Sequence, residues 1–265
     1  MTTSESVSSK HKCRMRYSAD DKLKMINRAK EIGNKAASDE FGVTRNSIRI
    51  WKKEYEKRRS YTYNLVEYLK KHKTELARIA TSEMGKPLKE SIGEVEKCAW
   101  ALEFYADHGD SFLSDEVLNT DARKSFLTFE PLGVIGSIMP WNFPYWQALR
   151  FAAPCLMAGN VIVMKPSRVT MQSGIEIEKA FTESGMPDGI FQTVVGSVES
   201  ANHLIDSDVN AVTFTGSTNA GSKVGERAAK QLKKCVLELG GSDPFIVLDD
   251  AIIEKAAEGA VKGRF

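Results

Sequence analysis

From Pro131 onward, short apolar runs alternate with amphipathic segments, and this alternation restricts the fold more than any other feature. The apolar runs have the length of buried strands: GVIGSIM, NVIVMK, QTVVG, AVTFTG, and CVLEL with PFIVL. The segments 173–184, 200–206 and 221–231 lie between them and have helical periodicity. Strands and helices in this order are typical of an open, doubly wound α/β sheet with parallel strands. We therefore predict a Rossmann-like α/β domain.

The charge of the chain divides it into two unequal parts. Residues 1–59 contain 16 Lys and Arg against 8 Asp and Glu, whereas the remaining residues contain 21 against 27. A basic head with a net charge of +8 thus precedes an acidic body with a net charge of −6. Such an asymmetry indicates two units of different role. We expect a disordered basic arm over 1–16, a small all-α helix-turn-helix over 17–59, and the α/β body over 61–265.

The head has the pattern of three short helices. Ser18 is a suitable N-cap for the first, 35–41 forms the second, and Thr44 opens the third over 45–59. The segment KLKMINRAKEIGNKAASDEFGVTRNSIRIWKKE resembles the DNA-binding heads of transposases and pipsqueak-type domains. That resemblance implies DNA contacts by six residues of the third helix: Arg45, Asn46, Ser47, Arg49, Lys52 and Lys53. The alternative is a solvated three-helix bundle with a charged face.

The region before the sheet is expected to be helical. Two long helical stretches run from Tyr61 to about Asp110, with a break near Gly85-Lys86-Pro87, and 116–130 forms a hairpin or a long strand. The four cysteines lie far apart without a CxxC pair, so we expect neither disulfides nor a metal site. The N-terminus lacks an apolar core, and no run is long enough to span a bilayer. These features predict a cytoplasmic protein without a membrane partner.

Four motifs place chemically useful groups at the ends of predicted strands. Asn142 in PWNFP can donate to a developing oxyanion, and Lys165 in MKPS can bind a ribose hydroxyl or a phosphate. Gly216 and Gly221 in FTGSTNAG form a turn before a helix that suits a pyrophosphate. Glu238 in ELGG lies where burial raises the pKa of a carboxyl toward that of a general base. Each motif also has an ordinary structural explanation as a turn, a cap or a surface side chain.

The order of the motifs is more specific than any one of them. PWNFP, KPS, FTGST and ELGG, with EMGKP and FEPLGV upstream, resemble the aldehyde dehydrogenase family over 61–265, and succinate-semialdehyde dehydrogenase-like members in particular. The resemblance implies an oxidoreductase that converts a small aldehyde to a carboxylate with NADP or NAD. Asn142 matches the oxyanion amide and Glu238 the general base. The implied cofactor-binding residues are Ile138, Met139, Pro140, Trp141, Lys165, Ser167, Arg168, Gly196, Gly216, Ser217, Leu239 and Gly240.

Two departures from the family pattern affect the expected function. Arg168 stands where many NAD-preferring members have Glu, and a cation there attracts a 2′-phosphate, which favours NADP. The nucleophilic cysteine of the family lies further along, in an FxNxGQxC-like segment that the 265 residues do not contain. We therefore expect a truncated chain that is inactive alone and whose assembly into the family's homo-oligomers is open. The alternatives are a DNA-binding regulator with a degenerate dehydrogenase body and a transposase-derived fusion.

Overall fold

The computed structural model describes residues 45–264, with side chains from 56 to 263. The predicted arm over 1–16 and the first two helices of the head lie outside the described residues. The third predicted helix does not end near Ser60: it is the first part of one continuous helix, α2 (Arg45–Met84). The side chains of the six predicted DNA-binding residues, Arg45, Asn46, Ser47, Arg49, Lys52 and Lys53, are outside the described part, so their contacts stay a prediction.

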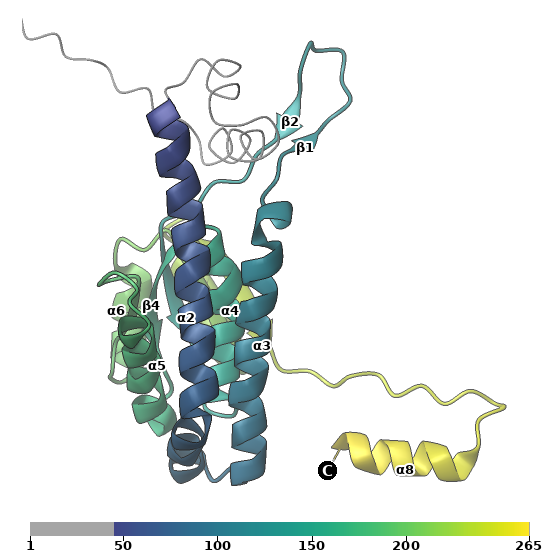
Figure 1. Cartoon of the computed structure of the whole chain (residues 1–265). Helices are drawn as coiled ribbons and strands as arrows, with labels where there is room; N and C mark the ends of the chain where they lie inside the picture. The colour runs from purple at the N-terminus through teal and green to yellow at the C-terminus, as the bar shows by residue number, and fades with distance from the viewer. Residues whose placement is uncertain (1–44, 265) are drawn as a thin grey trace, which may run out of the picture.

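Helices α2 and α3 (Leu88–Phe112) lie side by side and are joined by a three-residue turn (Figure 1). Gly85 at this turn has φ +78°, a conformation that costs little only for glycine. Its N–H donates to Thr81 O at 2.9 Å, and Pro87 precedes the first residue of α3. The predicted break near Gly85-Lys86-Pro87 is confirmed. None of the helices in residues 45–264 combines the length and apolarity that crossing a bilayer requires.

Five parallel strands form the central sheet in the order β5-β4-β3-β6-β7. Their bounds are β3 Val134–Ile138, β4 Val161–Lys165, β5 Phe191–Thr193, β6 Ala211–Gly216 and β7 Lys234–Leu239. The connecting helices are α4 Pro144–Met157, α5 Met171–Glu183, α6 Val198–Asp206 and α7 Thr218–Ala229, with a 3-10 turn η1 at Arg168–Thr170. The predicted doubly wound α/β sheet is confirmed, because the strand order reverses at β3.

Helices cover both faces of this sheet and create two separate cores. One core joins α2, α3, α4 and α5 to the sheet through side chains such as Leu102, Leu149 and Phe181. The other joins α6 and α7 to the sheet through Leu204 and Phe214, among others. Burial of these apolar side chains is the main source of stability for the arrangement. The two cores fix which strand ends lie next to one another.

The end of the described chain differs from the prediction. The segment PFIVL is not a strand: residues 240–248 have no regular structure, and Phe245 and Ile246 are 59% and 78% exposed. Strand β7 forms as predicted but is not buried, since it is an edge strand paired only with β6 among the described residues. Beyond it the chain extends away from the sheet to helix α8 (Ile253–Arg264) (Figure 1). Apolar sequence alone cannot create a buried strand where no neighbouring layer covers it.

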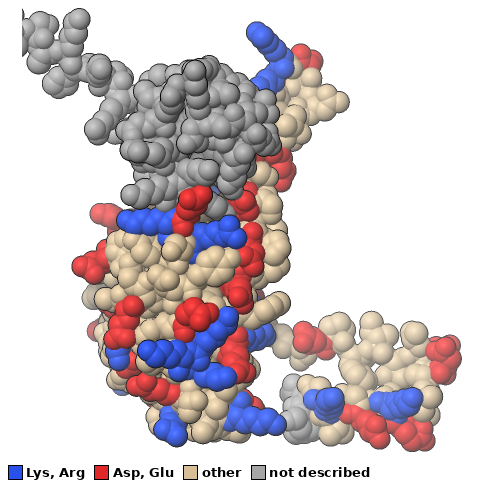
Figure 2. Space-filling view, in the orientation of Figure 1, with Lys and Arg blue, Asp and Glu red and all other residues tan. Residues whose placement is uncertain are grey.

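The segment 116–130 forms a hairpin that projects from the end of α3 (Figure 1). Strands β1 (Glu116–Val117) and β2 (Phe126–Leu127) pair antiparallel, with Glu116 opposite Leu127. The hairpin was one of the two predicted forms. On the face drawn in Figure 2, basic and acidic side chains of the described residues are interspersed rather than gathered into areas of one sign.

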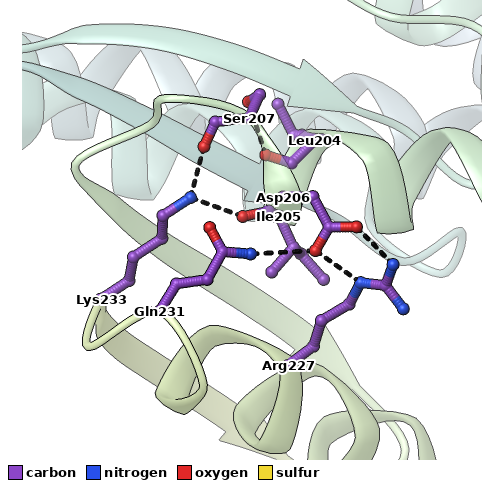
Figure 3. A network of polar contacts seen from close by, with 7 residues as sticks. All are labelled: Leu204, Ile205, Asp206, Ser207, Arg227, Gln231 and Lys233. Carbon is purple, nitrogen blue, oxygen red and sulfur yellow. Dashed lines mark hydrogen bonds and ion pairs between the residues drawn. The ribbon is translucent and has the colours of Figure 1, made fainter.

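A polar network joins the end of α6 to the last turn of α7 and to the segment after it (Figure 3). Asp206 accepts hydrogen bonds from Arg227 Nε at 2.8 Å and from Gln231 Nε2 at 2.9 Å, and it pairs with Arg227 Nη2. Lys233 Nζ donates to the carbonyl oxygens of Ile205, at 2.6 Å, and Ser207. These bonds tie the last carbonyls of α6 to the chain that enters β7.

This network predicts a specific dependence of stability on pH. The hydrogen bonds and charge of Arg227 hold the pKa of Asp206 below its usual range. A carboxyl with a lowered folded pKa stabilises above its unfolded pKa of about 4, and the contribution is lost as the pH falls through the folded pKa. Asp206→Asn should therefore lower the melting temperature at pH 7 by more than at pH 3, in thermal unfolding with Asp121→Asn from the exposed hairpin loop as control. Equal losses at the two pH values would contradict this account.

Candidate functional site

The carboxyl ends of four neighbouring strands meet at one edge of the sheet. In the register, Ile138 of β3 lies opposite Lys165 of β4, and Thr215 of β6 lies opposite Glu238 of β7. Met139 N donates to Lys165 O at 3.1 Å and continues the pairing of β3 and β4 past the last strand residue. The four predicted motifs are thus brought together at the edge where open α/β sheets bind ligands.

The motif PWNFP forms the turn from β3 into α4. Ile138 and Met139 are buried beneath the turn, whereas Trp141 and Asn142 are exposed. Helix α4 begins at Pro144, directly after the turn, as is favourable for proline in the first helical turn. The amide of Asn142 is therefore carried by a short segment between a buried strand and a helix, with Pro140 and Pro144 restricting the backbone on either side.

Lys165 is the most unusual side chain of this edge. It is 6% exposed, and no hydrogen bond or ion pair of its ammonium to another described residue is found. Burial, followed by the nearby charge of Arg168, lowers its pKa below the ordinary value. Its ammonium is not among the fully buried polar atoms without a partner, so the tip of a largely buried side chain is accessible to a ligand that offers hydroxyl or phosphate oxygens. Lys165 therefore fits the predicted role as a cofactor ligand.

Residues on both sides of Lys165 complete this part of the edge. Ser167 Oγ accepts from Val169 N at 3.3 Å, and Arg168 is exposed at the start of η1. Gly196 lies between β5 and α6, where a Cβ would come within 2.1 Å of Ser200 Oγ. A larger residue at Gly196 would have to move Ser200, so the backbone here approaches its neighbours more closely than other residues permit.

The turn between β6 and α7 has the geometry of an anion site. Ser217 is the N-cap of α7, and its hydroxyl accepts from Ala220 N at 3.3 Å. The preceding N–H groups of the helix, on Thr218 and Asn219, have no acceptor within the helix. Gly221 has a packing role, because a Cβ there would come within 2.3 Å of Leu239 Cδ2. The helix N-terminus after Gly216 and Ser217, rather than the GxxxxG spacing, is therefore what suits a pyrophosphate.

Glu238 differs from its prediction. Its side chain is 55% exposed, and Arg150 Nη2 of α4 donates to its Oε2 at 3.4 Å. The predicted burial of this carboxylate is therefore wrong for the described residues. The reason is the edge position of β7, which also leaves Leu239 and Gly240 exposed.

An open cavity of about 420 Å³ lies beside Glu238, between α3, α4 and the last two strands. Its walls include five aromatic side chains, and Trp100, Phe104, Trp146 and Arg150 are lining residues that the sequence motifs did not indicate. Arg150 is the one Lys or Arg among the described residues that line it. A signal for Arg150 was present in the sequence, because a charged residue interrupts the apolar helix PYWQALRFAAPCLM.

None of the three described cysteines has the environment of a nucleophile. Cys98 is completely buried, and burial raises its thiol pKa well above the ordinary value. Burial also raises the pKa of Cys155 to about 12 and raises that of Cys235. A reactive cysteine needs the opposite shift, toward the thiolate at neutral pH.

Comparisons with known proteins agree with this geometry. The model of the aldehyde dehydrogenase family matches residues 8–265. The chain is 47% identical over 199 residues to a probable NADP⁺ succinate-semialdehyde dehydrogenase of Synechocystis, covering 75% of this chain and 44% of that protein. It is 42% identical over 198 residues to the NAD(P)⁺ succinate semialdehyde dehydrogenase of Escherichia coli, covering 74% and 43%. A succinic semialdehyde dehydrogenase of Streptococcus pyogenes, solved with NADP⁺, superposes with a TM-score of 0.74 at 35% identity, covering 77% and 45%.

The matches also show how much of the relatives and of this chain is covered. The chain spans less than half the length of these relatives. The family model also begins at residue 8 and so includes most of the segment for which the sequence predicts a DNA-binding head. The predicted boundary between that head and the body, near residue 60, stays a prediction.

Proposed function

The chain belongs to the aldehyde dehydrogenase family, and we propose that it forms the NADP-binding part of an enzyme that oxidises succinic semialdehyde to succinate. Oxidation of an aldehyde to a carboxylate removes a hydride and adds the oxygen of one water molecule. The nicotinamide cofactor supplies the hydride acceptor when bound. The residues of this chain hold the cofactor, stabilise the oxyanion and activate water.

Lys165 is the observation that carries the proposal. Its side chain is largely buried, its ammonium has no partner among the described residues, and it lies opposite Ile138, the last residue of β3 before the turn. Ribose hydroxyls would satisfy this donor, and the N-terminus of α7 would receive the pyrophosphate. Arg168 lies three residues further and is exposed, where a 2′-phosphate would meet its guanidinium. This arrangement supports NADP over NAD.

The proposed chemistry uses two further residues of the edge. The amide of Asn142 would donate to the oxygen that becomes negative when a thiolate attacks the aldehyde. Glu238 would accept the proton of the water that hydrolyses the thioester, once its ion pair with Arg150 opens. The described cysteines are unsuited to provide the thiolate, so this role falls to a residue outside 56–263.

The substrate is proposed from the cavity beside Glu238, which five aromatic side chains help to line. Arg150 is the single Lys or Arg of the described lining, and its guanidinium can bind a carboxylate in the fork geometry. An aldehyde with a carboxylate at its far end would satisfy both the cavity and this cation. The names of the similar proteins from Synechocystis and Escherichia coli agree with a semialdehyde of this kind.

Nucleotide binding tests the proposal directly on this chain. In a calorimetric titration we expect NADP⁺ to bind more tightly than NAD⁺. Arg168→Glu should weaken NADP⁺ binding by about 10- to 100-fold and strengthen NAD⁺ binding, since a carboxylate repels the 2′-phosphate and accepts a ribose hydroxyl. Lys179→Glu, an equal charge change on the exposed side of α5, is the control and should leave the preference unchanged.

Two outcomes would count against the proposal. Failure of both nucleotides to bind a folded chain would remove the cofactor role. An unchanged NADP⁺ preference in Arg168→Glu would place recognition of the 2′-phosphate elsewhere.

DNA binding by residues 17–59 is a separate proposal that rests on their basic composition and on their resemblance to DNA-binding heads. Homo-oligomer formation is likewise a separate proposal, which a measurement of the mass in solution would test.

A further inference from the structure

A buried ion pair lies directly beneath the start of α4. Lys86 Nζ donates to Glu94 Oε2 at 2.6 Å, and the two side chains are only 7% and 2% exposed. Glu94 Oε1 accepts hydrogen bonds from Tyr145 N and Trp146 N, both at 2.9 Å. The carboxylate, which comes from α3, thus contacts both its counter-charge and the first turn of another helix.

Helix α4 depends on this carboxylate because its own sequence provides no cap. Its N-cap residue is Phe143, which has no side-chain oxygen, and no side-chain cap bond is formed by it. Tyr145 is 1% exposed, so water cannot satisfy its N–H group. Glu94 supplies both missing acceptors, and its negative charge is favoured at the positive end of the helix dipole.

Lys86 extends the same contact to the turn itself. Its ammonium lies 3.5 Å from the centre of the Phe143 ring, within the range of a cation–π interaction. Phe143 is the residue next to Asn142, and Tyr145 is three residues beyond it. The ion pair therefore holds the chain immediately after the amide, while the sheet holds the chain before it through Met139 and Lys165.

We propose that Glu94 and Lys86 are positioning residues, which fix the start of α4 and thereby the place of the Asn142 amide at the sheet edge. The catalytic meaning of this placement rests on the proposed function, in which Asn142 stabilises the oxyanion. A donor that must meet a developing charge works only if it is held in place before the reaction. The motif EMGKP, which contains Lys86, would thus act on the motif PWNFP through the contact of Lys86 with Phe143 and through Glu94 with the first turn of α4.

The test compares signals of Asn142 in the chain with and without the carboxylate, by NMR of ¹⁵N-labelled protein. In Glu94→Gln we expect the amides of Tyr145 and Trp146 to exchange about tenfold faster, since the cap is weakened. The side-chain amide resonances of Asn142 should shift as well. Lys86→Met, which leaves the cap in place but removes the contact to Phe143, should also shift the Asn142 side-chain signals.

The chain offers a matched control in a second carboxylate cap. Glu83 accepts from Gln172 N at 2.7 Å, from Ser173 N at 2.9 Å and from Ser173 Oγ at 2.6 Å, at the start of α5. Glu83→Gln should accelerate exchange at Gln172 and Ser173 and leave the Asn142 signals unchanged. A shift of equal size in this control would mean that any loss of a cap disturbs the turn, and it would overturn the proposal.

If the Asn142 signals do not move in either Glu94→Gln or Lys86→Met, Glu94 and Lys86 only cap α4 and do not position Asn142, and the proposal is wrong. If Glu94→Gln does not fold, Lys86→Met alone decides by the same criterion. The measurement needs no nucleotide, whereas the proposed function is judged by NADP⁺ titration of the unmodified chain. A failure of the positioning role can therefore be distinguished from a failure of the proposed function.

Discussion

Replacing Glu94 by Ala is expected to lower the free energy of unfolding by about 3–5 kcal/mol, because the change leaves the Lys86 ammonium buried without its counter-charge. The variant also leaves Tyr145 N and Trp146 N without acceptors. Urea unfolding followed by circular dichroism would measure the loss. The matched control is Glu96→Ala on the same helix, whose partner Lys73 is exposed, and it should cost less than about 1 kcal/mol.

A second variant separates the charge from the packing. In the double variant Lys86→Met, Glu94→Gln no charge remains buried and one carbonyl oxygen is still available to cap α4. Stability should then return to within about 2 kcal/mol of the unmodified chain. A loss in Glu94→Ala no larger than in Glu96→Ala would show that water reaches Lys86 and that the pair is not buried in solution.

Replacing Lys165 by Met is expected to weaken NADP⁺ binding by about 100-fold while making the nucleotide-free chain more stable. The residue is 6% exposed and its ammonium has no partner among the described residues, so its removal relieves a desolvation cost in the nucleotide-free chain. Calorimetric titration and thermal unfolding measure the two effects. A general loss of folding would lower both the affinity for NADP⁺ and the melting temperature. Loss of a cofactor ligand should lower the affinity and raise the melting temperature.

The same residue gives the stability a dependence on alkaline pH. Burial and the charge of Arg168 lower the pKa of Lys165 in the folded chain. Between that value and the unfolded pKa of about 10.4 the unfolded chain binds more protons, so the contribution to stability rises with pH in this window. Lys165→Met should lack this rise. An identical alkaline profile in the two proteins would show that the ammonium is solvated.

Much of the fold was readable from periodicity. The runs ending at Ile138, Lys165, Gly216 and Leu239 all became parallel strands, because apolar runs of this length with helices between them have few other arrangements. The break at Gly85 was equally local, since the residue adopts a positive φ. The prediction of a buried strand at PFIVL was wrong for a nonlocal reason. Burial of this segment would depend on a neighbouring layer that the described chain does not provide.

The candidate site likewise has features that the local sequence determined and features that depend on tertiary contacts. The sequence by itself determined which groups stand at strand ends, Asn142, Lys165 and Glu238 among them, because a strand followed by a turn is a local property. Only the tertiary structure decided their surroundings. It left Lys165 buried without a described partner, exposed Glu238 beside Arg150, and brought Glu94 under a helix 50 residues away in the sequence. Burial and pairing depend on contacts between distant segments, which periodicity does not encode.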